Sequence, residues 1–347
     1  MKNNNSSKLT DHKIVIAGQL QQEYILPPAG NAHNNIPGGM GLYAAAGAKI
    51  WVDSVSLLAK VGENYPTEWL AEFEQFGIAT SGVQVMPQSI ESVSFYAYDQ
   101  NLRGSSKHPA THYLQRGLPF PKDLLTLSSG ISASQNRSQE NDLTLRLADI
   151  PSGMKNAKAL LMVEIALSNQ LQLSTFFSAN HANTISCAPK PAEMANGFSK
   201  NIQLLANNCR IFFTSEQMLR NLFWDQHESI LNLAAKITHM GAEMVVVSRG
   251  FRGSYVLEKH TKQKWHIPPF GNKIVDPTGS MAANYGGVTA GYYLTLDPVE
   301  AALYGCVSES ICCDGSGPMF MLQSLPELGL HRLRQMRGKI KKIKDSE

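Results

Sequence analysis

Residues 275–291, VDPTGSMAANYGGVTAG, are the stretch that decides the fold of this 347-residue chain. An extended segment with alternating apolar residues, Trp265 to Val275, leads into it, and a helix of small residues is predicted to follow. Gly279 frees the backbone for a tight bend between the two, and Thr278 or Ser280 can cap the helix. The N–H groups at such a helix start have the positive end of the helix dipole behind them, which favours an anion such as phosphate.

These residues also resemble the C-terminal signature of the ribokinase/PfkB family of sugar kinases. The usual form of that signature is Asp-Thr/Pro-x-Gly-Ala-Gly-Asp, followed by a helix of small residues. Asp276 to Gly279 match its first four positions, and Gly286 and Gly287 match the helix. The resemblance implies an α/β fold, namely a ribokinase-like three-layer α/β/α sandwich with a small β-sheet lid.

The next three positions depart from the signature. Ser280 replaces the usual Ala, Met281 replaces the second Gly, and Ala282 stands where the family keeps its catalytic Asp. In the family this Asp takes the proton from the sugar hydroxyl that attacks the γ-phosphate. Alanine cannot accept a proton. The resemblance therefore implies the fold but does not imply kinase activity.

Other parts of the chain, from Lys13 to Pro326, resemble the family in the same order. Gly38 and Gly39 precede a predicted Ala-rich helix and resemble the di-glycine sugar motif. Residues 61–64 resemble a Val-Gly-x-Asp turn, and residues 247–254 resemble a Gly-x-x-Gly turn near the nucleotide. Residues 301–318 resemble the helix and turn beside the adenine pocket.

The resemblance therefore implies a set of site residues, with ATP and Mg²⁺ as cofactors and a small-molecule sugar or nucleoside as the substrate. The implied anion hole consists of Gly279, Ser280, Met281 and Ala282. The implied nucleotide-binding residues are Ser248, Gly250, Gly253, Asp276, Thr278 and Gly315. The implied substrate-binding residues are Glu23, Gly38, Gly39 and Met40.

At three further sites this chain has a different residue from the one that the family usually has. After the first strand the family usually has an Asp that binds sugar hydroxyls, and here Glu23 is the acidic residue on offer, with a different reach. Met40 stands where the family often places Asn. The Asn-x-x-Glu motif that helps to hold Mg²⁺ is reduced to residues 214–217, in which Glu216 is acidic but off register, so that it could act only through water. Neutralisation by Mg²⁺ is central to phosphoryl transfer, so this is a second deficit.

Strand and helix patterns alternate along the chain, as in a parallel sheet connected by crossovers. Residues 13–18, 55–60, 159–163, 184–187, 210–213 and 241–247 are predicted strands, and residues 67–76, 167–178, 216–223, 229–240 and 299–313 are predicted helices. We expect a lid from residues 20–36 and 90–118, with strands at Tyr24–Leu26, Val93–Tyr98 and His112–Leu114. A single kinase domain is expected over residues 13–330. Residues 1–12 and the polar insertion 127–143 are expected to be disordered.

Charge is distributed unevenly. The net charge is +3, but seven basic residues follow residue 331, so the rest of the chain is slightly acidic and carries no nucleic-acid signature. A basic segment can contact membranes or nucleic acid. We expect residues 331–347 instead to form a solvated, frayed tail.

The remaining composition favours a protein that is soluble in the cytoplasm. Five cysteines lack C-x-x-C spacing and indicate buried thiols in a reducing compartment. No apolar run approaches the length of a membrane span, and the N-terminus has no apolar signal core. We therefore expect neither a membrane nor a nucleic-acid partner.

Two rival motifs carry less weight. Residues 39–44 satisfy the dinucleotide pattern G-x-G-x-x-A, but about twenty residues separate them from Gly18 at the end of the first strand, where that motif belongs. His108 and His112 are four residues apart, yet they lie in a polar stretch without other metal-ligand spacing. Arg249 and Arg252 could contact nucleotide phosphates or simply face solvent.

Three functions remain open. The first is a degenerate sugar or nucleoside kinase, weak or inactive because Ala282 has replaced the base. The second is a non-catalytic binding or regulatory protein that uses the retained pocket. The third is a slow kinase that uses another carboxylate. A homodimer through the lid, as often occurs in the resembled family, is an expected assembly.

Overall fold

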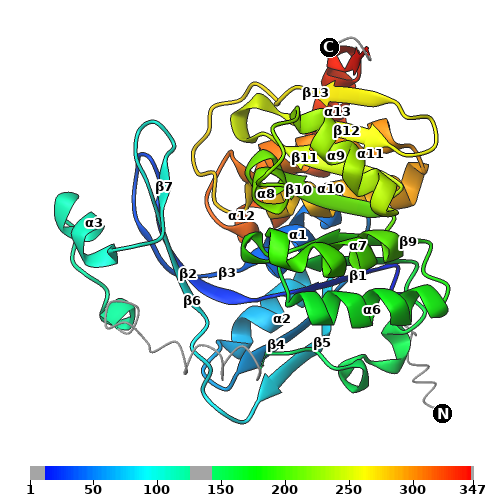
Figure 1. Ribbon diagram of the computed structural model, residues 1–347. Coiled ribbons are helices and arrows are strands. Elements are labelled where there is room, and N and C mark those ends of the chain that lie inside the picture. The colour runs from blue at the N-terminus through cyan, green and yellow to red at the C-terminus, as the bar shows by residue number, and fades with distance from the viewer. Residues whose placement is uncertain (1–11, 126–142, 345–347) are drawn as a thin grey trace.

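The computed structural model describes residues 12–125 and 143–344 (Figure 1). Within them the chain forms a ten-stranded sheet, helices on both of its faces, and a separate four-stranded sheet to one side. This is the expected α/β sandwich with a small lid sheet. The predicted disorder of residues 1–12 and 127–143 concerns segments that, apart from His12 and Leu143, lie outside the described residues.

The large sheet has the strand order β14-β13-β12-β11-β10-β9-β8-β1-β4-β5. Its strands are β1 (Ile14–Gly18), β4 (Val55–Gly62), β5 (Ile78–Met86), β8 (Ala159–Val163), β9 (Thr184–Ala188), β10 (Ile211–Ser215), β11 (Met244–Ser248), β12 (Ser254–Glu258), β13 (Lys264–Ile267) and β14 (Lys341–Ile343). The strands from β5 to β11 are parallel, and β12 to β14 are antiparallel. The expected extended segment from Trp265 to Val275 is wrong beyond Ile267, where β13 ends.

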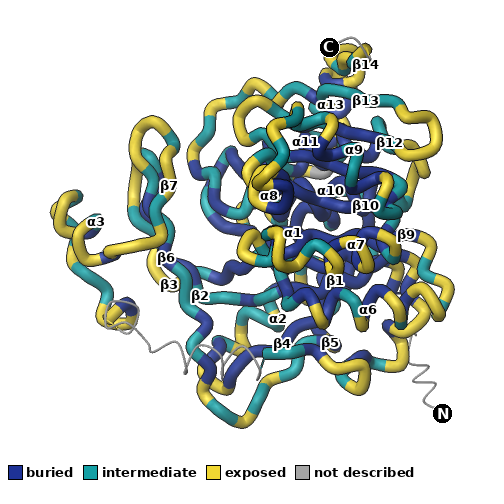
Figure 2. Tube along the Cα trace, in the orientation of Figure 1, coloured by how far each residue is buried: buried dark blue, intermediate teal, exposed yellow. Residues whose placement is uncertain are grey.

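Two helical layers cover the sheet (Figure 1). One face carries α1 (Met40–Lys49), α2 (Thr67–Gln75), α10 (Ser280–Thr295), α11 (Pro298–Cys312), α12 (Pro318–Leu322) and α13 (Pro326–Met336). The other carries α6 (Leu167–Ala179), α7 (Ser199–Asn208), α8 (Glu216–Leu222) and α9 (Ile230–Met240). Each layer buries its own apolar cluster against the sheet, so β1 and β8 are buried over their whole length. Figure 2 shows this burial for β1.

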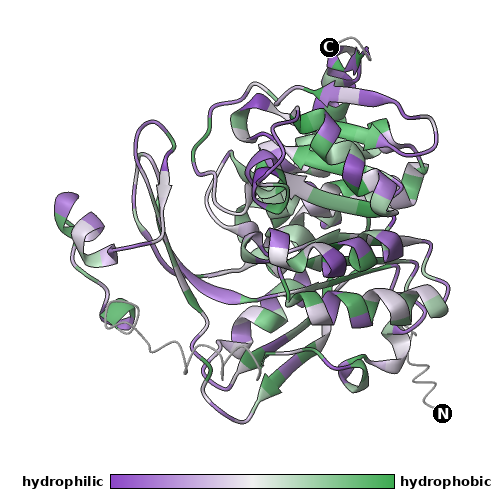
Figure 3. Cartoon of the chain, in the orientation of Figure 1, coloured by the Kyte–Doolittle hydropathy of each residue, from purple (hydrophilic) through white to green (hydrophobic). Residues whose placement is uncertain are grey.

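The alternation of apolar strands and amphipathic helices explains these layers. The central strands are rich in apolar residues, whereas the outward faces of the outer helices are polar (Figure 3). Burial of the apolar faces is the dominant favourable term in forming such a sandwich.

Helices α1 and α10 pack closely because small residues line their contact. A Cβ atom added to Gly286 would lie 1.9 Å from the carbonyl oxygen of Ala44. Similarly, a Cβ atom on Gly47 would lie 2.2 Å from the oxygen of Ala283. Gly286 in the opening stretch and Gly47 on α1 therefore allow the two helices to pack closely.

The lid sheet has the order β3-β2-β6-β7, made of β2 (Gln21–Leu26), β3 (His33–Gly38), β6 (Val93–Tyr98) and β7 (Gly104–Ser105). It has a small core of its own that includes Tyr24, Phe95 and Tyr113. The prediction of a strand at His112–Leu114 is wrong, because these residues belong to helix α3 (Pro109–Gln115). Pro109 begins this helix at the position where proline is favoured, a start signal that outweighs three apolar-looking residues.

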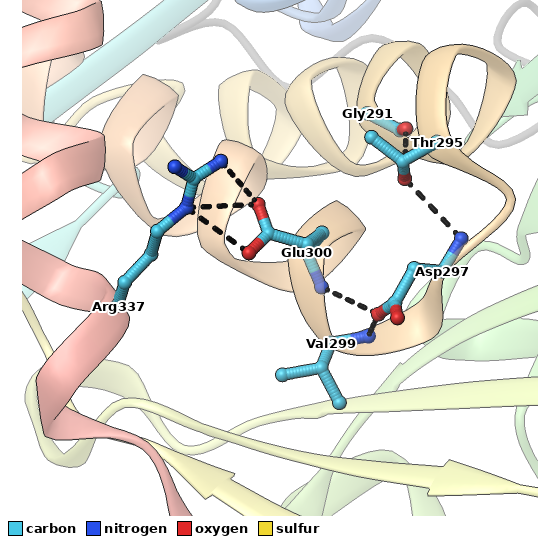
Figure 4. A network of polar contacts seen from close by, with 6 residues as sticks. All are labelled: Gly291, Thr295, Asp297, Val299, Glu300 and Arg337. Carbon is cyan, nitrogen blue, oxygen red and sulfur yellow. Dashed lines mark hydrogen bonds and ion pairs between the residues drawn. The ribbon is translucent and has the colours of Figure 1, made fainter.

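The basic C-terminal segment is ordered through residue 344, so the expectation of a frayed tail is wrong there. Helix α13 extends across residue 331, and strand β14 pairs antiparallel with β13. Arg332 forms an ion pair with Asp314. Arg337 donates to both carboxylate oxygens of Glu300 on α11, with the shortest contact at 2.9 Å (Figure 4).

The same view shows how α11 begins (Figure 4). Asp297 is its N-cap, and the Asp297 carboxylate accepts from the backbone N–H groups of Val299 and Glu300 at 2.8 and 2.9 Å. This satisfies two donors that have no partner within the helix. The cap fixes the connection from α10, which precedes it, to α11.

Within the described residues, no helix combines the length and the apolar character that crossing a membrane requires.

Candidate functional site

A cavity of about 370 Å³ lies where the lid, the ends of β10 and β11, and the start of α10 meet. Its volume is in the range of small-molecule sites. It is lined by Glu23, Met40, Tyr43, Tyr96, Tyr98, Leu102, Ser215, Ser248, Gly250, Phe251, Pro277, Thr278, Gly279, Ser280, Met281 and Glu309. The cavity therefore collects the stretch quoted at the outset and segments far from it in the chain.

The turn before α10 is held by a buried carboxylate. One oxygen of Asp276 accepts from the backbone N–H of Thr278 at 2.9 Å and from its hydroxyl at 2.7 Å. Its other oxygen, Oδ2, is buried and has no hydrogen-bond partner among the described residues. Asp276 thus shapes the turn from beneath and does not line the cavity.

Gly279 is the N-cap of α10 and has φ 73°, a backbone conformation that favours glycine. It has no side chain to cap the helix, so the first N–H groups of α10, such as that of Met281, have no partner within the helix. A Cβ atom at position 279 would lie 2.2 Å from the ring of Tyr43. The cap must therefore be glycine both for its φ and for its contact with Tyr43.

Glu23 lines the cavity and is almost fully buried. Its carboxylate accepts from the backbone N–H of Gly39 at 2.8 Å and from the hydroxyl of Tyr43 at 3.0 Å. A Cβ atom on Gly38 would lie 2.1 Å from the Glu23 carboxyl carbon, so the di-glycine motif makes room for this side chain. The pKa of Glu23 is raised to about 7. Burial is the main cause and the charge of Asp276 adds to it, whereas the two hydrogen bonds lower the pKa.

Glu309, on α11, is a second carboxylate at the cavity, and sequence reasoning missed it. Its Oε2 atom accepts from the amide of Asn284 on α10 at 2.9 Å. Burial raises its pKa to about 7, although the hydrogen bond from Asn284 lowers it. The available signal was a glutamate between two serines on a helix face otherwise made of small residues.

Ala282 has no exposed surface and packs in the core on the α1 side of the sheet. Of the four residues expected to form the anion hole, Gly279, Ser280 and Met281 line the cavity and Ala282 does not. Glu23 and Met40 line it from the substrate side, whereas Gly38 and Gly39 lie behind Glu23.

The expected nucleotide residues divide in the same way. Ser248, Gly250 and Thr278 line the cavity. Gly253 has φ 83°, and a Cβ atom there would lie 2.1 Å from the oxygen of Ile267, so it serves the turn into β12. Gly315 packs against the ring of Phe320, where a Cβ atom would lie 2.5 Å from it.

Glu216 is engaged in ion pairs. One oxygen accepts from Nε of Arg249 at 2.7 Å, and the other accepts from Arg252. Partial burial raises the pKa of Glu216, but the hydrogen bonds and charges of the two arginines outweigh this and hold it below its usual value. Within the described chain, no group of three His, Cys, Asp or Glu residues is arranged to hold a metal ion. The one acidic residue at the family's metal motif, Glu216, is thus engaged by two arginines.

The cavity offers groups that suit a nucleotide. The turn from Pro277 to Met281 offers backbone N–H groups, and Gly250 leaves open space at the cavity wall. No lysine, arginine or histidine lines the cavity.

A larger cavity, of about 700 Å³, lies in the lid between β6 and residues 106–111. It shares Tyr96 with the first but contains no part of the α10 turn. We therefore take the smaller cavity as the candidate site.

The sandwich, the lid and the glycine turn at the start of α10 together define a ribokinase-like protein. The model of the pfkB family of carbohydrate kinases matches residues 133–325, more than half of the chain. The chain belongs to this family.

Individual relatives are distant. The chain is 23% identical to a cytidine kinase of Thermococcus kodakarensis over 280 residues, which cover 80% of this chain and 88% of the relative. A ribokinase from Thermotoga maritima has a similar structure, with a TM-score of 0.64 at 19% identity, covering 92% of this chain and 99% of the other. A fructokinase from Xylella fastidiosa solved with bound ATP has a TM-score of 0.68 at 12% identity, covering 93% and 99%. At these identities the structures support the fold alone.

Proposed function

We propose that this protein is a sugar or nucleoside kinase homologue that binds its ligands in the cavity before α10 and in which phosphoryl transfer is weak or lost. The observation that carries the proposal is Ala282, a buried methyl group at the position where the family signature has its proton acceptor. A positioned base contributes roughly 10²–10⁴ to a rate.

A second deficit points the same way. The remainder of phosphoryl transfer is positioning and electrostatic stabilisation, in which Mg²⁺ neutralises the developing negative charge. Glu216, the acidic residue nearest to the family's metal motif, is neutralised by Arg249 and Arg252. Residues that would contact ATP are those of the turn, Gly279 to Met281, together with Ser248 and Gly250. When bound, ATP supplies the phosphoryl group. The chain supplies the backbone N–H groups at the start of α10, which favour the negatively charged phosphates.

The test is a pair of substitutions at one position. Ala282→Asp restores a proton acceptor, and Ala282→Asn introduces a side chain of the same shape that accepts no proton at neutral pH. We expect ATP-dependent phosphorylation of a sugar and nucleoside panel to be near background in the wild type and to rise by roughly 10²-fold or more only in the Asp variant. Thermal unfolding of both variants is measured in parallel, because residue 282 has no exposed surface.

Robust turnover by the wild type would contradict the proposal and favour a kinase that uses another carboxylate. Glu23 and Glu309 are the two that line the cavity. In that case Glu309→Gln or Glu23→Gln should abolish the wild-type activity.

The second candidate function is a non-catalytic binding or regulatory protein. The ion pairs of Glu216 favour it, because they leave the metal motif without a free carboxylate. Tight binding of a sugar or nucleoside without turnover, in the wild type and in Ala282→Asp alike, would identify this case.

The five buried free cysteines are compatible with a reducing compartment such as the cytoplasm.

A further inference from the structure

The ionisable side chains that line the cavity are acidic and not basic. They are Glu23 and Glu309, and Asp276 lies close enough to raise the pKa of Glu23. The guanidinium groups of Arg249 and Arg252, which flank the lining residue Gly250, are both paired with Glu216. Away from the backbone N–H groups of the α10 turn, a ligand in this cavity would meet carboxylates and no side-chain cation, so a ligand with hydrogen-bond donors would find acceptors there.

Glu309 has one carboxylate oxygen that accepts no hydrogen bond from the described residues. Both oxygens of Glu23 accept hydrogen bonds within the protein. In Glu309, Asn284 holds Oε2, and Oε1 makes no hydrogen bond with the described residues and is not sealed from solvent. Asn284 thus orients the group and leaves one acceptor available to a ligand.

The rest of the wall suits a flat aromatic ligand. Tyr96 and Tyr98 come from the lid, Phe251 from the turn after β11, and Met40 from the start of α1. Phe251 is 52% exposed, so part of its side chain is available for contact with a ligand. Stacking of a nucleobase on aromatic side chains is favourable and depends little on which base is bound. Selectivity must therefore come from a polar group.

We propose that Glu309 makes this cavity selective for a nucleoside whose base has an exocyclic amino group over the matching nucleoside with a carbonyl group in its place. The inference rests on the proposed function in one respect, that this cavity is the ligand site. An amino group donates to a carboxylate oxygen, as in the pairing of acidic side chains with the cytosine amino group, whereas a carbonyl oxygen would face the carboxylate as a second acceptor.

The protonation state of Glu309 gives the proposal a pH signature. The groups that interact with it are the amide of Asn284 and the side chains of Tyr285, Cys306, Cys312 and Cys313, all uncharged at neutral pH. Because burial raises the pKa of Glu309 to about 7, it is ionised above that pH and accepts from an amino group. Below that pH the protonated acid can donate to a carbonyl oxygen, which should reduce the preference.

The experiment uses two matched pairs of nucleosides, cytidine with uridine and adenosine with inosine, titrated calorimetrically into the full chain at pH 8.5 and pH 6. We expect the amino member of at least one pair to bind roughly tenfold tighter, or more, at pH 8.5, with a smaller ratio at pH 6. In Glu309→Gln the ratio should lose its pH dependence. Glu300→Gln, the same change on the outer face of α11 where Glu300 pairs with Arg337, should behave as the wild type.

Equal affinities within both pairs at pH 8.5 in the wild type would overturn the inference, and this measurement needs no variant to fold. A preference that survives unchanged in a folded Glu309→Gln would also overturn it. Binding of sugars but of no nucleoside would do the same. None of these outcomes depends on turnover, so the kinase assays with Ala282→Asp test the proposed function separately.

Discussion

At the scale of single residues, Glu23 has an unusual environment. It is 1% exposed and is held by a backbone N–H and a tyrosine hydroxyl in a space that Gly38 leaves open. Two hydrogen bonds do not fully replace the water that a carboxylate loses on burial. The folded state therefore binds the Glu23 proton more tightly than the unfolded chain does.

This environment predicts a pH-dependent stability. The ordinary pKa of Glu23 is 4.5 and the folded value is about 7, so its contribution is fully present below pH 4.5 and is lost as the pH rises through 7. The magnitude is on the order of 3 kcal/mol at most. Glu23→Gln should flatten the fall in the free energy of unfolding between pH 5 and pH 8, measured by urea denaturation.

The matched control for this prediction is Glu63→Gln, since Glu63 is exposed. It should leave the pH profile of the wild type unchanged. A profile for Glu23→Gln that is as steep as that of the wild type would show that the carboxylate is ionised in the folded state at pH 5.

At the scale of elements, most of the sandwich was predictable from the sequence, whereas short segments such as α3 and β14 were not. The buried strands and amphipathic helices were predictable because their apolar spacing extends over five or more residues. Helix α3 was not, because three residues around Tyr113 cannot distinguish a strand from a helix, and the proline that starts the helix lies outside them. Strand β14 was hidden because its lysines are exposed and only its backbone pairs with β13.

The site was predictable where it depends on backbone and was missed where it depends on tertiary neighbours. Gly279 is recognisable in the sequence because its turn requires a glycine. Glu309 is not, because it becomes part of the cavity only when α11 packs beside α10 and Asn284 turns toward it. Likewise, the sequence left Arg249 and Arg252 open between phosphate and solvent, and their pairing with Glu216 depends on the fold bringing α8 beside that turn.

The start of α11 provides a prediction at the scale of an element. Asp297 accepts from two backbone N–H groups, so Asp297→Ala should lower the free energy of unfolding by about 1 kcal/mol. Arg337→Gln, which removes the neighbouring ion pair of a half-exposed arginine, should cost less than that because surface pairs contribute little. Equal losses for the two variants in chemical denaturation would contradict this order.

At the scale of the whole molecule, the lid stands apart from the sandwich (Figure 1). Leu114, on α3 beside the lid sheet, is 80% exposed. A homodimer through the lid, proposed from the family resemblance, would cover such residues.

Sedimentation velocity tests this assembly. We expect a dimer for the wild type and a shift toward monomer for Leu114→Asp. Leu204→Asp, on α7 of the sandwich and 59% exposed, should remain a dimer. A monomeric wild type at micromolar concentration would exclude the proposed assembly.

Strand β14 has a consequence for behaviour in concentrated solution. It closes one margin of the ten-stranded sheet with three residues, of which Lys341 and Lys342 are exposed. Two like charges along a short margin repel the same margin of a neighbouring molecule, and its brevity gives an incoming chain few backbone groups to pair with. We therefore expect Lys341 and Lys342, which in the sequence resemble part of a nucleic-acid or membrane tail, to disfavour edge-to-edge pairing between molecules.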